Sequence, residues 1–210
     1  MARYTGPTCH LCRYLGEKLM LKGEKCSTPK CPLGKRNVPR RGRSLRQRRR
    51  RVSDRGLQLQ EKQKVRFSYG ILERQFRRFF AKAERASGIT EENLLTLLER
   101  RLDNVVYRLG FADSRPQARQ IVRHGHILVN ERKTDIPSYL IKSGDVIKWK
   151  DTSTKTEYYK IMVEKVKGKV IPGWLSLDEE KMLGSVSALP SKDDIETKFD
   201  SKAIVEYYSR

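Results

Sequence analysis

The sequence predicts an α+β fold with three parts: a zinc-bound N-terminal segment, a helical body, and a module that combines short helices with a β-hairpin. Three observations support this prediction. All four cysteines fall within the first 31 residues, apolar residues recur at helical spacing between residues 57 and 109, and short apolar alternations follow residue 125. No apolar run approaches the roughly 18 residues that span a bilayer, so we expect no integral membrane protein, and no membrane is among the expected partners.

The four cysteines have the spacing C-x2-C-x13-C-x4-C, formed by Cys9, Cys12, Cys26 and Cys31. Two close pairs joined by a short loop can converge on one Zn2+. Four protein ligands leave no position open for a substrate, so this ion would be structural. Two disulfides, a redox pair and an iron–sulfur cluster are the alternatives. The first seven residues lack the apolar stretch of a secretion signal, which disfavours disulfides, and zinc is the favoured interpretation.

The net charge of +21 is unevenly distributed along the chain. Residues 1–150 contain 36 basic and 14 acidic side chains, whereas residues 151–210 contain 10 and 11. The densest stretch, residues 35–55, holds 11 basic side chains, of which ten are arginine. Arginine grips phosphate with a planar fork and stacks on bases, so this charge favours nucleic acid over lipid. A solvated tail or a localisation signal is the alternative for this arginine-rich arm.

The helical body is predicted from apolar periodicity between residues 57 and 109. Phe76, Phe79 and Phe80 share one face of the helix expected over residues 72–86. Aromatic residues beside arginines could form a platform for stacking bases, but an apolar stripe at this spacing is more often buried core. We therefore expect these side chains to pack inside the body.

Residues 114–125, SRPQARQIVRHG, predict a short helix. Ser114 suits the N-cap, Gln117 completes the pattern of a capping box, and Gly125 suits the end of the helix. Three arginines recur at every fourth position and are expected along one side: Arg115, Arg119 and Arg123. A row of cations without intervening acids suggests a surface for anions, with a solvated helix face as the alternative.

Short strands are expected after this helix. Residues 126–129 alternate in polarity, Asn130 suits a turn, and residues 133–136 complete a predicted hairpin. A further strand is expected over residues 146–149. Toward the C-terminus, the sequence predicts a helix over 154–166 and short strands over 183–189 and 203–208.

Several stretches resemble the family of bacterial small-subunit ribosomal protein number four. The segment RLDNVVYRLGFADSRPQARQIVRHGHILVN, with IPSY and SGDVI, is similar to the RNA-binding module of that family. RYTGP, the four cysteines, LQEKQKVRFSYGILERQFRRFF, GWLSLD and VEYYSR resemble the same family in the same order. The resemblance therefore covers nearly the whole chain, which matters because the module alone also occurs in RNA-modifying enzymes and some synthetases.

The chain departs from the family at three places. Glu131 stands where glycine is usual in the hairpin turn, and Thr134 stands where an aliphatic residue is common. The arm at 35–55 is richer in arginine than the corresponding loop of the family. All four cysteines are kept, so the resemblance implies an intact zinc site.

The resemblance also implies a domain organisation. Residues 1–45 would form the zinc-binding N-terminal segment and the start of the basic arm. Residues 46–98 would form the helical body, completed by residues 170–210. Residues 99–165 would be an inserted RNA-binding module, and residues 166–210 a C-terminal segment that returns to the body.

The function implied by the resemblance is that of a structural, non-catalytic constituent of the small ribosomal subunit in the cytoplasm. Such proteins bind rRNA directly at a multi-helix junction of the 5′ domain, early in assembly. They contact the neighbouring small-subunit protein number five, at an interface associated with translational accuracy. They also lie where mRNA enters the subunit, and some repress their own mRNA.

The RNA contacts implied by the resemblance fall on the short helix and the hairpin turn: Arg115, Gln117, Arg119, Arg123, His124, Asn130 and Lys133. Phosphate and 2′-hydroxyl groups are the chemistry such side chains recognise. Further RNA contacts are expected from the arginine-rich arm: Arg46, Arg48, Arg49, Arg50 and Arg51.

Two other function classes compete with this one. An RNA-modifying enzyme would need a catalytic domain, but residues 151–210 are too few, and the sequence shows no paired-carboxylate, nucleophile–histidine or phosphate-loop motif. A zinc-containing DNA-binding regulator would need a base-reading recognition helix and a dimer interface, neither of which is evident.

Overall fold

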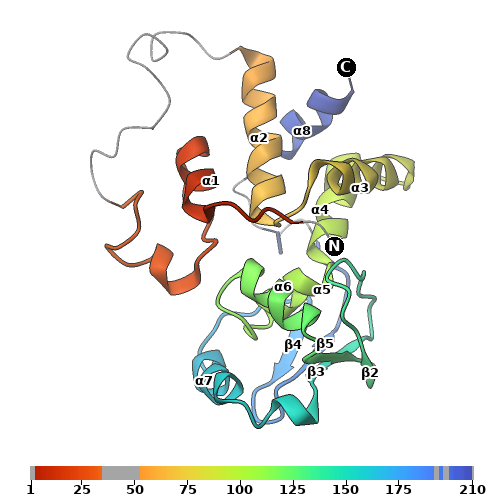
Figure 1. Ribbon diagram of the computed structural model, residues 1–210. Helices are drawn as coiled ribbons and strands as arrows, with labels where there is room; N and C mark the ends of the chain where they lie inside the picture. The colour runs from red at the N-terminus through yellow and green to blue at the C-terminus, as the bar shows by residue number, and fades with distance from the viewer. Residues whose placement is uncertain (1–2, 35–52, 192–193, 196–198, 210) are drawn as a thin grey trace. The chain divides into compact units, whose positions relative to one another are not determined.

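The computed structural model describes residues 3–34, 53–191, 194–195 and 199–209 (Figure 1). Two compact units divide the chain. The helical unit comprises residues 1–91 and 197–210, and the module unit comprises residues 92–196. Both helices and an antiparallel sheet are present, as the α+β prediction requires. Within the described ranges, no helix is long and apolar enough to cross a bilayer.

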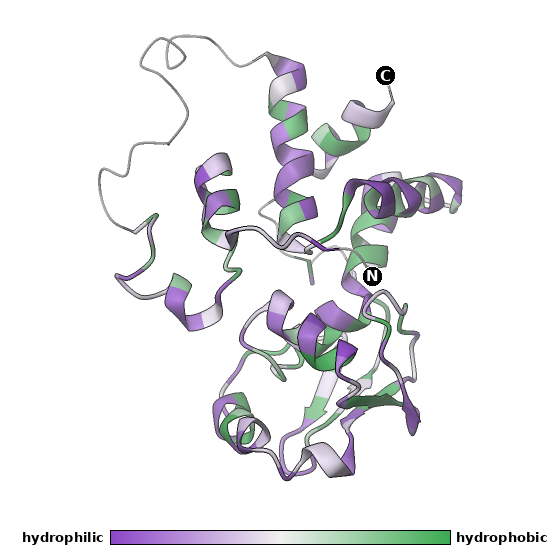
Figure 2. Ribbon diagram, viewed as in Figure 1, coloured by the Kyte–Doolittle hydropathy of each residue, from purple (hydrophilic) through white to green (hydrophobic). Residues whose placement is uncertain are grey.

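In the described part of the helical unit there are four helices and a 3-10 turn: α1 (Thr8–Leu15), η1 (Gly23–Cys26), α2 (Asp54–Ser68), α3 (Glu73–Arg85) and α8 (Ser201–Tyr208). A further helix, α4 (Thr90–Glu99), begins at the end of this unit. Helix α3 buries Phe76, Phe79 and Phe80 and exposes most of its charged residues, and Figure 2 shows both kinds of residue along it. The prediction that these aromatic residues belong to the core is therefore confirmed.

Residues 203–208 form helix α8, so the strand predicted there is wrong. Asp200 caps the helix, since its carboxylate accepts a hydrogen bond from the backbone N–H of Ala203 at 3.2 Å. Ile204 is fully buried, and the Tyr208 ring lies 4.5 Å from that of Phe80 between centroids. Valine and tyrosine favour strands by themselves, but the burial of this apolar face against α2 and α3 outweighs that preference.

A carboxylate, Glu73, holds α8 to the rest of the helical unit. Lys62 and Tyr208 each donate a hydrogen bond to it at 2.9 Å, and Lys62 is itself buried. Burial alone would raise the pKa of Glu73, but the hydrogen bonds from Lys62 and Tyr208 and the charges of Lys62 and Arg66 lower it below the ordinary 4.5. The ionised form of Glu73 is therefore favoured by folding.

Acid is expected to weaken the helical unit through Glu73. A carboxyl whose pKa is lower in the folded chain stabilises the fold above its unfolded pKa, and this stabilisation is lost as the pH falls through the folded value. Glu73→Gln should cost about 1–3 kcal/mol at pH 7, since hydrogen bonds to a charged group are lost. It should also flatten the loss of stability below pH ~4.5. Urea unfolding followed by circular dichroism between pH 7 and 3 measures both effects. Glu84→Gln, exposed on the same helix, is the control, and equal acid sensitivity in the two variants would contradict the role of Glu73.

The module unit combines helices with a five-stranded antiparallel sheet of order β2-β1-β3-β5-β4. Its elements after α4 are α5 (Leu102–Arg108), α6 (Arg115–Arg123), β1 (Ile127–Val129), β2 (Arg132–Lys133), β3 (Val146–Trp149), η3 (Asp151–Ser153), α7 (Glu157–Val166), β4 (Leu175–Asp178) and β5 (Leu183–Val186). The predicted helix at 114–125, the hairpin and the strand at 146–149 are all present. Strand β2 is shorter than predicted and begins one residue earlier.

The module unit extends further along the chain than the predicted 99–165. Strand β5 pairs with β3, where Val146 lies opposite Ser185, and β4 pairs with β5. Residues 170–196 therefore lie with the module, and only residues 197–210 return to the helical unit. Gly184 permits this pairing, because a side chain there would collide with Leu109.

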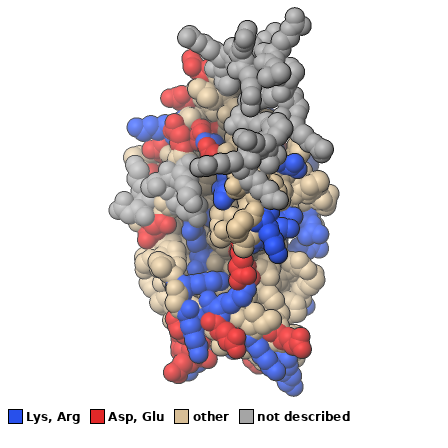
Figure 3. All heavy atoms as spheres, turned by 90° about the vertical axis from the view of Figure 1, so that its left-hand side faces the viewer, with Lys and Arg blue, Asp and Glu red and all other residues tan. Residues whose placement is uncertain are grey.

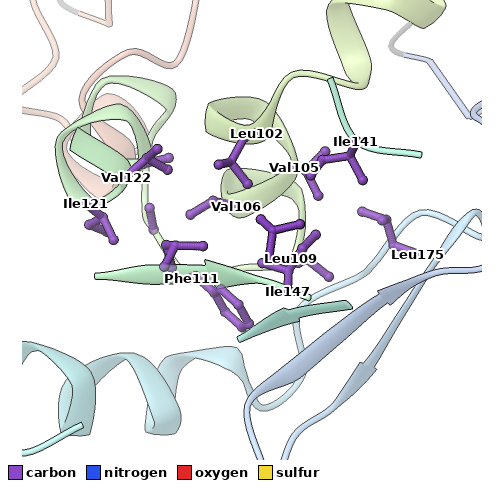
Figure 4. Packing of buried hydrophobic residues seen from close by; sticks show 14 of the residues in the cluster. Leu102, Val105, Val106, Leu109, Phe111, Ile121, Val122, Ile141, Ile147 and Leu175 are labelled. Carbon is purple, nitrogen blue, oxygen red and sulfur yellow. The ribbon is translucent and has the colours of Figure 1, made fainter. Parts of the chain in front are cut away.

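The core of the module unit lies between the helices and the sheet. Val105 of α5, Leu109 directly after it, Val122 of α6 and Ile147 of β3 belong to this core and are fully buried, and Figure 4 shows Leu109 beside Ile147. These residues recur at helical spacing in the sequence, whereas the strand residues alternate. The core fixes how α6 lies on the sheet, and so determines which side of α6 meets solvent.

Candidate RNA-binding face

Helix α6 begins at Ser114, as predicted, with Pro116 in its first turn. The expected capping box is not formed. The Ser114 side chain makes no capping hydrogen bond, and Oε1 of Gln117 accepts the backbone N–H of Asp113, one residue before the N-cap, at 3.0 Å. Gln117 is half-buried, so its position reflects the start of the helix as well as any contact with RNA.

Two of the three arginines on α6 face inward. Arg119 has 6% of its surface exposed, and its Nη1 lies 3.2 Å from the Asp103 carboxylate. Arg115, 8% exposed, donates through Nε to Asn104 at 2.8 Å, and its guanidinium lies 4.8 Å from the centroid of the Tyr107 ring. Both arginines therefore connect α6 to α5.

Arg123 is exposed although it continues the same spacing. Each step of four residues advances the direction of the side chain by about 40°, so Arg123 points about 80° away from Arg115. The first two positions fall on the side that packs on α5, and the third falls outside it. An RNA contact by Arg115 or Arg119 stays a prediction, and it would compete with these internal bonds.

Asp103 is the centre of the buried network. Arg101 is fully buried and donates to both oxygens of this carboxylate, at 3.0 and 2.7 Å, while Arg119 contacts it from α6. Burial lowers the pKa of the Arg119 guanidinium, and the neighbouring Asp103 counteracts this shift. A single carboxylate thus holds two cations inside the module unit. Arg101, Asp103 and Asn104 were not predicted as functional residues, although R-x-D-N just ahead of an arginine-rich helix contains the matching acceptors.

The exposed predicted residues gather at the end of α6 and on the adjacent hairpin. Arg123 and His124 are the last exposed positions of the helix, and Lys133 is exposed on β2. The aliphatic part of Lys133 lies against Gly125 so closely that a side chain at 125 would collide with it. Gly125 also has a φ of +73°, which glycine adopts without strain. We call the group of Arg123, His124 and Lys133 the basic face.

Asn130 supports the hairpin from its turn. Its amide donates to Asp145 at 2.8 Å and accepts the backbone N–H of Val146 at 2.9 Å. Asn130 and Glu131 both have positive φ, +48° and +66°, a conformation that glycine adopts without strain. Glu131 also forms an ion pair with Lys148 at 2.6 Å. The turn is therefore held from β3, and Asn130 stays exposed.

On the face that Figure 3 shows, the basic charge of the module unit is divided into small groups. Toward the lower end of Figure 3, where this unit is drawn, blue Lys and Arg atoms are interspersed with red Asp and Glu atoms. Such a surface favours contacts at particular phosphates over a uniform polyanion site. Residues 35–52 of the arginine-rich arm, which include Arg46, Arg48, Arg49, Arg50 and Arg51, lie outside the described residues.

The four cysteines are free thiols in the N-terminal segment. Cys9 and Cys12 lie in α1, Cys26 ends η1, and Cys31 follows it. Burial raises the pKa of Cys12, a backbone hydrogen bond at Leu19 lowers it, and the charges of the other three thiols raise it further. The backbone N–H of Lys22 donates to Sγ of Cys26 at 3.3 Å.

In the ranges that the structure covers, no three His, Cys, Asp or Glu side chains are close enough together to hold a metal ion. The donor set nevertheless suits zinc, because the four thiols interact electrostatically and two of them, Cys26 and Cys31, are buried. Leucines 11, 15, 19 and 21 form a small apolar cluster around the same segment.

Comparisons with known proteins agree with these observations. A family described as the ribosomal protein S4/S9 N-terminal domain matches residues 3–99, and the S4 domain matches residues 100–147. The chain is 57% identical over 210 residues to the small ribosomal subunit protein uS4 of Dehalococcoides mccartyi, with both chains covered completely. It is 53% identical to the proteins of the same name from Halothermothrix orenii and Pelotomaculum thermopropionicum, again over the full length of each. The chain therefore belongs to the uS4 family of small ribosomal subunit proteins.

Proposed function

We propose that this chain is a primary rRNA-binding protein that helps to nucleate assembly of the small subunit, and that the basic face is part of its RNA contact. Membership of the family already makes the chain a structural, non-enzymatic component of the small ribosomal subunit in the cytoplasm, and one that binds rRNA. The finer statement rests chiefly on one observation: three exposed side chains able to donate to phosphate are gathered at the end of α6.

The rigidity of α6 supports this proposal. Arg115 and Arg119 tie the helix to α5, and Asn130 holds the hairpin turn, so the basic face is presented in a fixed arrangement. Groups fixed in this way can recognise the shape of a folded RNA through its phosphates and 2′-hydroxyls. In this proposal Arg123, His124 and Lys133 contact RNA, and Gln117 lies at the edge of the contact. Arg115 and Arg119 do not contact RNA but hold α6 on α5.

The other proposed contacts follow from family membership and from charge. The arginine-rich arm, through Arg46 and Arg48–Arg51, is proposed to bind rRNA of the 5′ domain junction. The neighbouring small-subunit protein number five, with an effect on translational accuracy, and mRNA where it enters the subunit are the remaining proposed partners. Near neutrality of residues 151–210 suits contacts with protein rather than with RNA.

One structural Zn2+ is proposed as the cofactor, held by Cys9, Cys12, Cys26 and Cys31. When bound, it would supply folding energy to a segment whose only described apolar cluster is four leucines with partly buried neighbours. The cysteine residues would bind as thiolates, and each would give up its proton on binding.

Replacing Arg123 or Lys133 with alanine is expected to weaken rRNA binding and to change its salt dependence. Each lost phosphate contact should reduce the slope of log K against log salt concentration by roughly one, because one fewer counterion is released. Filter binding to small-subunit rRNA at several salt concentrations measures this slope. Lys181→Ala is the matched control, since Lys181 lies between β4 and β5 at the opposite edge of the sheet from the hairpin. Slopes that stay unchanged in both test variants would refute the proposal that the basic face contacts rRNA.

The proposed role in early assembly has its own test. The full chain should bind a protein-free fragment of the 5′ domain of small-subunit rRNA, without prior addition of other ribosomal proteins. Binding that appears only after other proteins are added would show that the chain is not a primary binder.

A further inference from the structure

A cavity of about 230 Å³ opens in the module unit beside the basic face. Side chains from α6, from the connection between α6 and β1, from β3 and from the start of α7 line it: Gln117, Gln120, Ile121, His124, His126, Trp149, Thr156 and Tyr158. Gln117 and His124 belong to the predicted RNA contacts, whereas the other six were not among them. Four of the eight lining residues carry flat rings, and none carries a carboxylate.

The aromatic rings that line the cavity contact one another. Trp149 is almost fully buried, and its ring centroid lies 6.2 Å from that of Tyr158 and 6.5 Å from that of His126. The rings of His124 and His126 are 5.9 Å apart. Nδ1 of His126 lies 2.9 Å from Oγ of Ser153, and Tyr158 donates to the carbonyl oxygen of Phe111 at 3.3 Å. These contacts keep the rings in place, so a flat ligand would meet preformed surfaces.

Polar groups at the cavity could form hydrogen bonds with the edge of a flat ring. Gln120 is exposed on α6 and makes no side-chain hydrogen bond within the described ranges. An amide can donate and accept at once, as the edge of a nucleobase requires. The indole N–H of Trp149, deep in the wall, is buried without a hydrogen-bond partner in the described part of the chain.

The cavity is better suited to a neutral ring than to a phosphate. No lysine or arginine lines it. Burial and the nearby charges of His124 and Lys150 lower the pKa of His126, which favours the neutral form of its ring. The exposed Arg123 directly precedes His124 in the chain and can accept a phosphate outside the cavity. The arrangement thus places a flat ring inside the cavity and leaves a phosphate of the same ligand to bind outside it.

We propose that this cavity receives one unpaired nucleobase of the rRNA, a proposal that rests on the proposed function of the basic face. The volume lies below the roughly 300–1,000 Å³ of typical small-molecule sites, which suits one heterocycle better than a whole nucleotide cofactor. Proteins that read RNA sequence commonly take an unstacked base from a loop or bulge, stack it on aromatic side chains and bind its edge. The chain would then read one base of the rRNA as well as the shape of its backbone.

Chemical probing of base edges tests this proposal. Small-subunit rRNA, alone and bound to the full chain, is treated with dimethyl sulfate and with carbodiimide, which together modify the pairing edges of all four unpaired bases. The wild-type chain is expected to protect one single-stranded base that Gln120→Ala leaves reactive, while the remaining protections persist. His124→Ala should leave the same base reactive. It should also weaken rRNA binding by up to about tenfold, because stacking of a base on an aromatic ring contributes to the affinity and would be lost. Gln120 and His124 are both exposed, so neither change removes buried core.

Lys160→Ala serves as the control, because Lys160 is exposed on α7 and does not line the cavity. Its footprint should equal that of the wild type. Identical footprints for wild type, Gln120→Ala and His124→Ala would overturn the base-binding cavity and leave the basic face standing. A wild-type chain that protects no part of the rRNA would instead overturn the proposed function itself, and the cavity proposal with it.

Discussion

Asp103→Ala is expected to lower the free energy of unfolding of the module unit by about 3–5 kcal/mol, since it removes a buried carboxylate that pairs with two buried guanidiniums. Asp103 is the carboxylate that Arg101 and Arg119 share, and these arginines have 0% and 6% of their surface exposed. Without the carboxylate, two neighbouring guanidiniums would repel each other in a poorly solvated site. The effect should exceed that of an ordinary surface substitution, which stays within about 0.5 kcal/mol.

Urea unfolding followed by tryptophan fluorescence measures this loss selectively. Both tryptophans of the chain, Trp149 and Trp174, are buried in the module unit. Asp135→Ala is the matched control, because Asp135 lies exposed near the hairpin. An Asp103→Ala chain as stable as the control would show that the network contributes little.

The same measurement separates Arg119 from Arg123. Arg119→Ala should destabilise the module unit, whereas Arg123→Ala should leave its stability unchanged and act on rRNA binding alone. If Arg119→Ala instead left stability unchanged and reduced the salt slope of binding, the direct RNA contact predicted from the sequence would hold and the internal role would fail.

The second large effect concerns the cysteines. The purified chain is expected to hold one equivalent of zinc, and Cys26→Ser to lose it. Structural zinc binds small domains with a free energy of roughly 10–16 kcal/mol at pH 7, and in such domains that energy supports folding. Loss of the ion should therefore unfold the segment around α1 and η1, while tryptophan fluorescence shows that the module unit stays folded.

Metal analysis and amide hydrogen exchange measure the two parts of this prediction. Protection in α1 should fall in Cys26→Ser and in wild type treated with a strong chelator. His10→Ala is the control, since His10 lies between two cysteines but is exposed and is not among the proposed ligands. A chain produced with ample zinc that contains none would refute the site, and bound iron with inorganic sulfide would favour the iron–sulfur alternative.

Local patterns in the sequence were sufficient for most of the helices and for the hairpin. The apolar spacing of Phe76, Phe79 and Phe80 identified α3 and its buried side, because a helix repeats its faces every 3.6 residues. Ser114, as a residue suited to the N-cap, and Gly125, as a residue suited to the end of a helix, identified the two ends of α6. These signals arise from neighbours within a few positions, so no knowledge of the rest of the chain was needed.

Longer-range contacts explain the errors. Residues 203–208 have the composition of a strand but form α8, because Ile204 and Tyr208 are buried against helices distant in sequence. Residues 170–196 were expected with the helical body, whereas the hydrogen bonds between β3 and β5 hold them in the module unit. Pairing of strands nearly 40 positions apart leaves no local trace in either strand.

By itself, the sequence determined the family of this protein, the concentration of positive charge in residues 1–150 and the grouping of four cysteines near the start. Only the tertiary structure decided how that charge is used. Arg115, Arg119 and Arg123 look equivalent along the chain, but the packing of α6 on α5 places two of them on internal acceptors and one in solvent. The same packing brings Gln120, His126 and Trp149 around one cavity. The physical reason is that the direction of a side chain follows from its helix, whereas its partner depends on what the fold places opposite it.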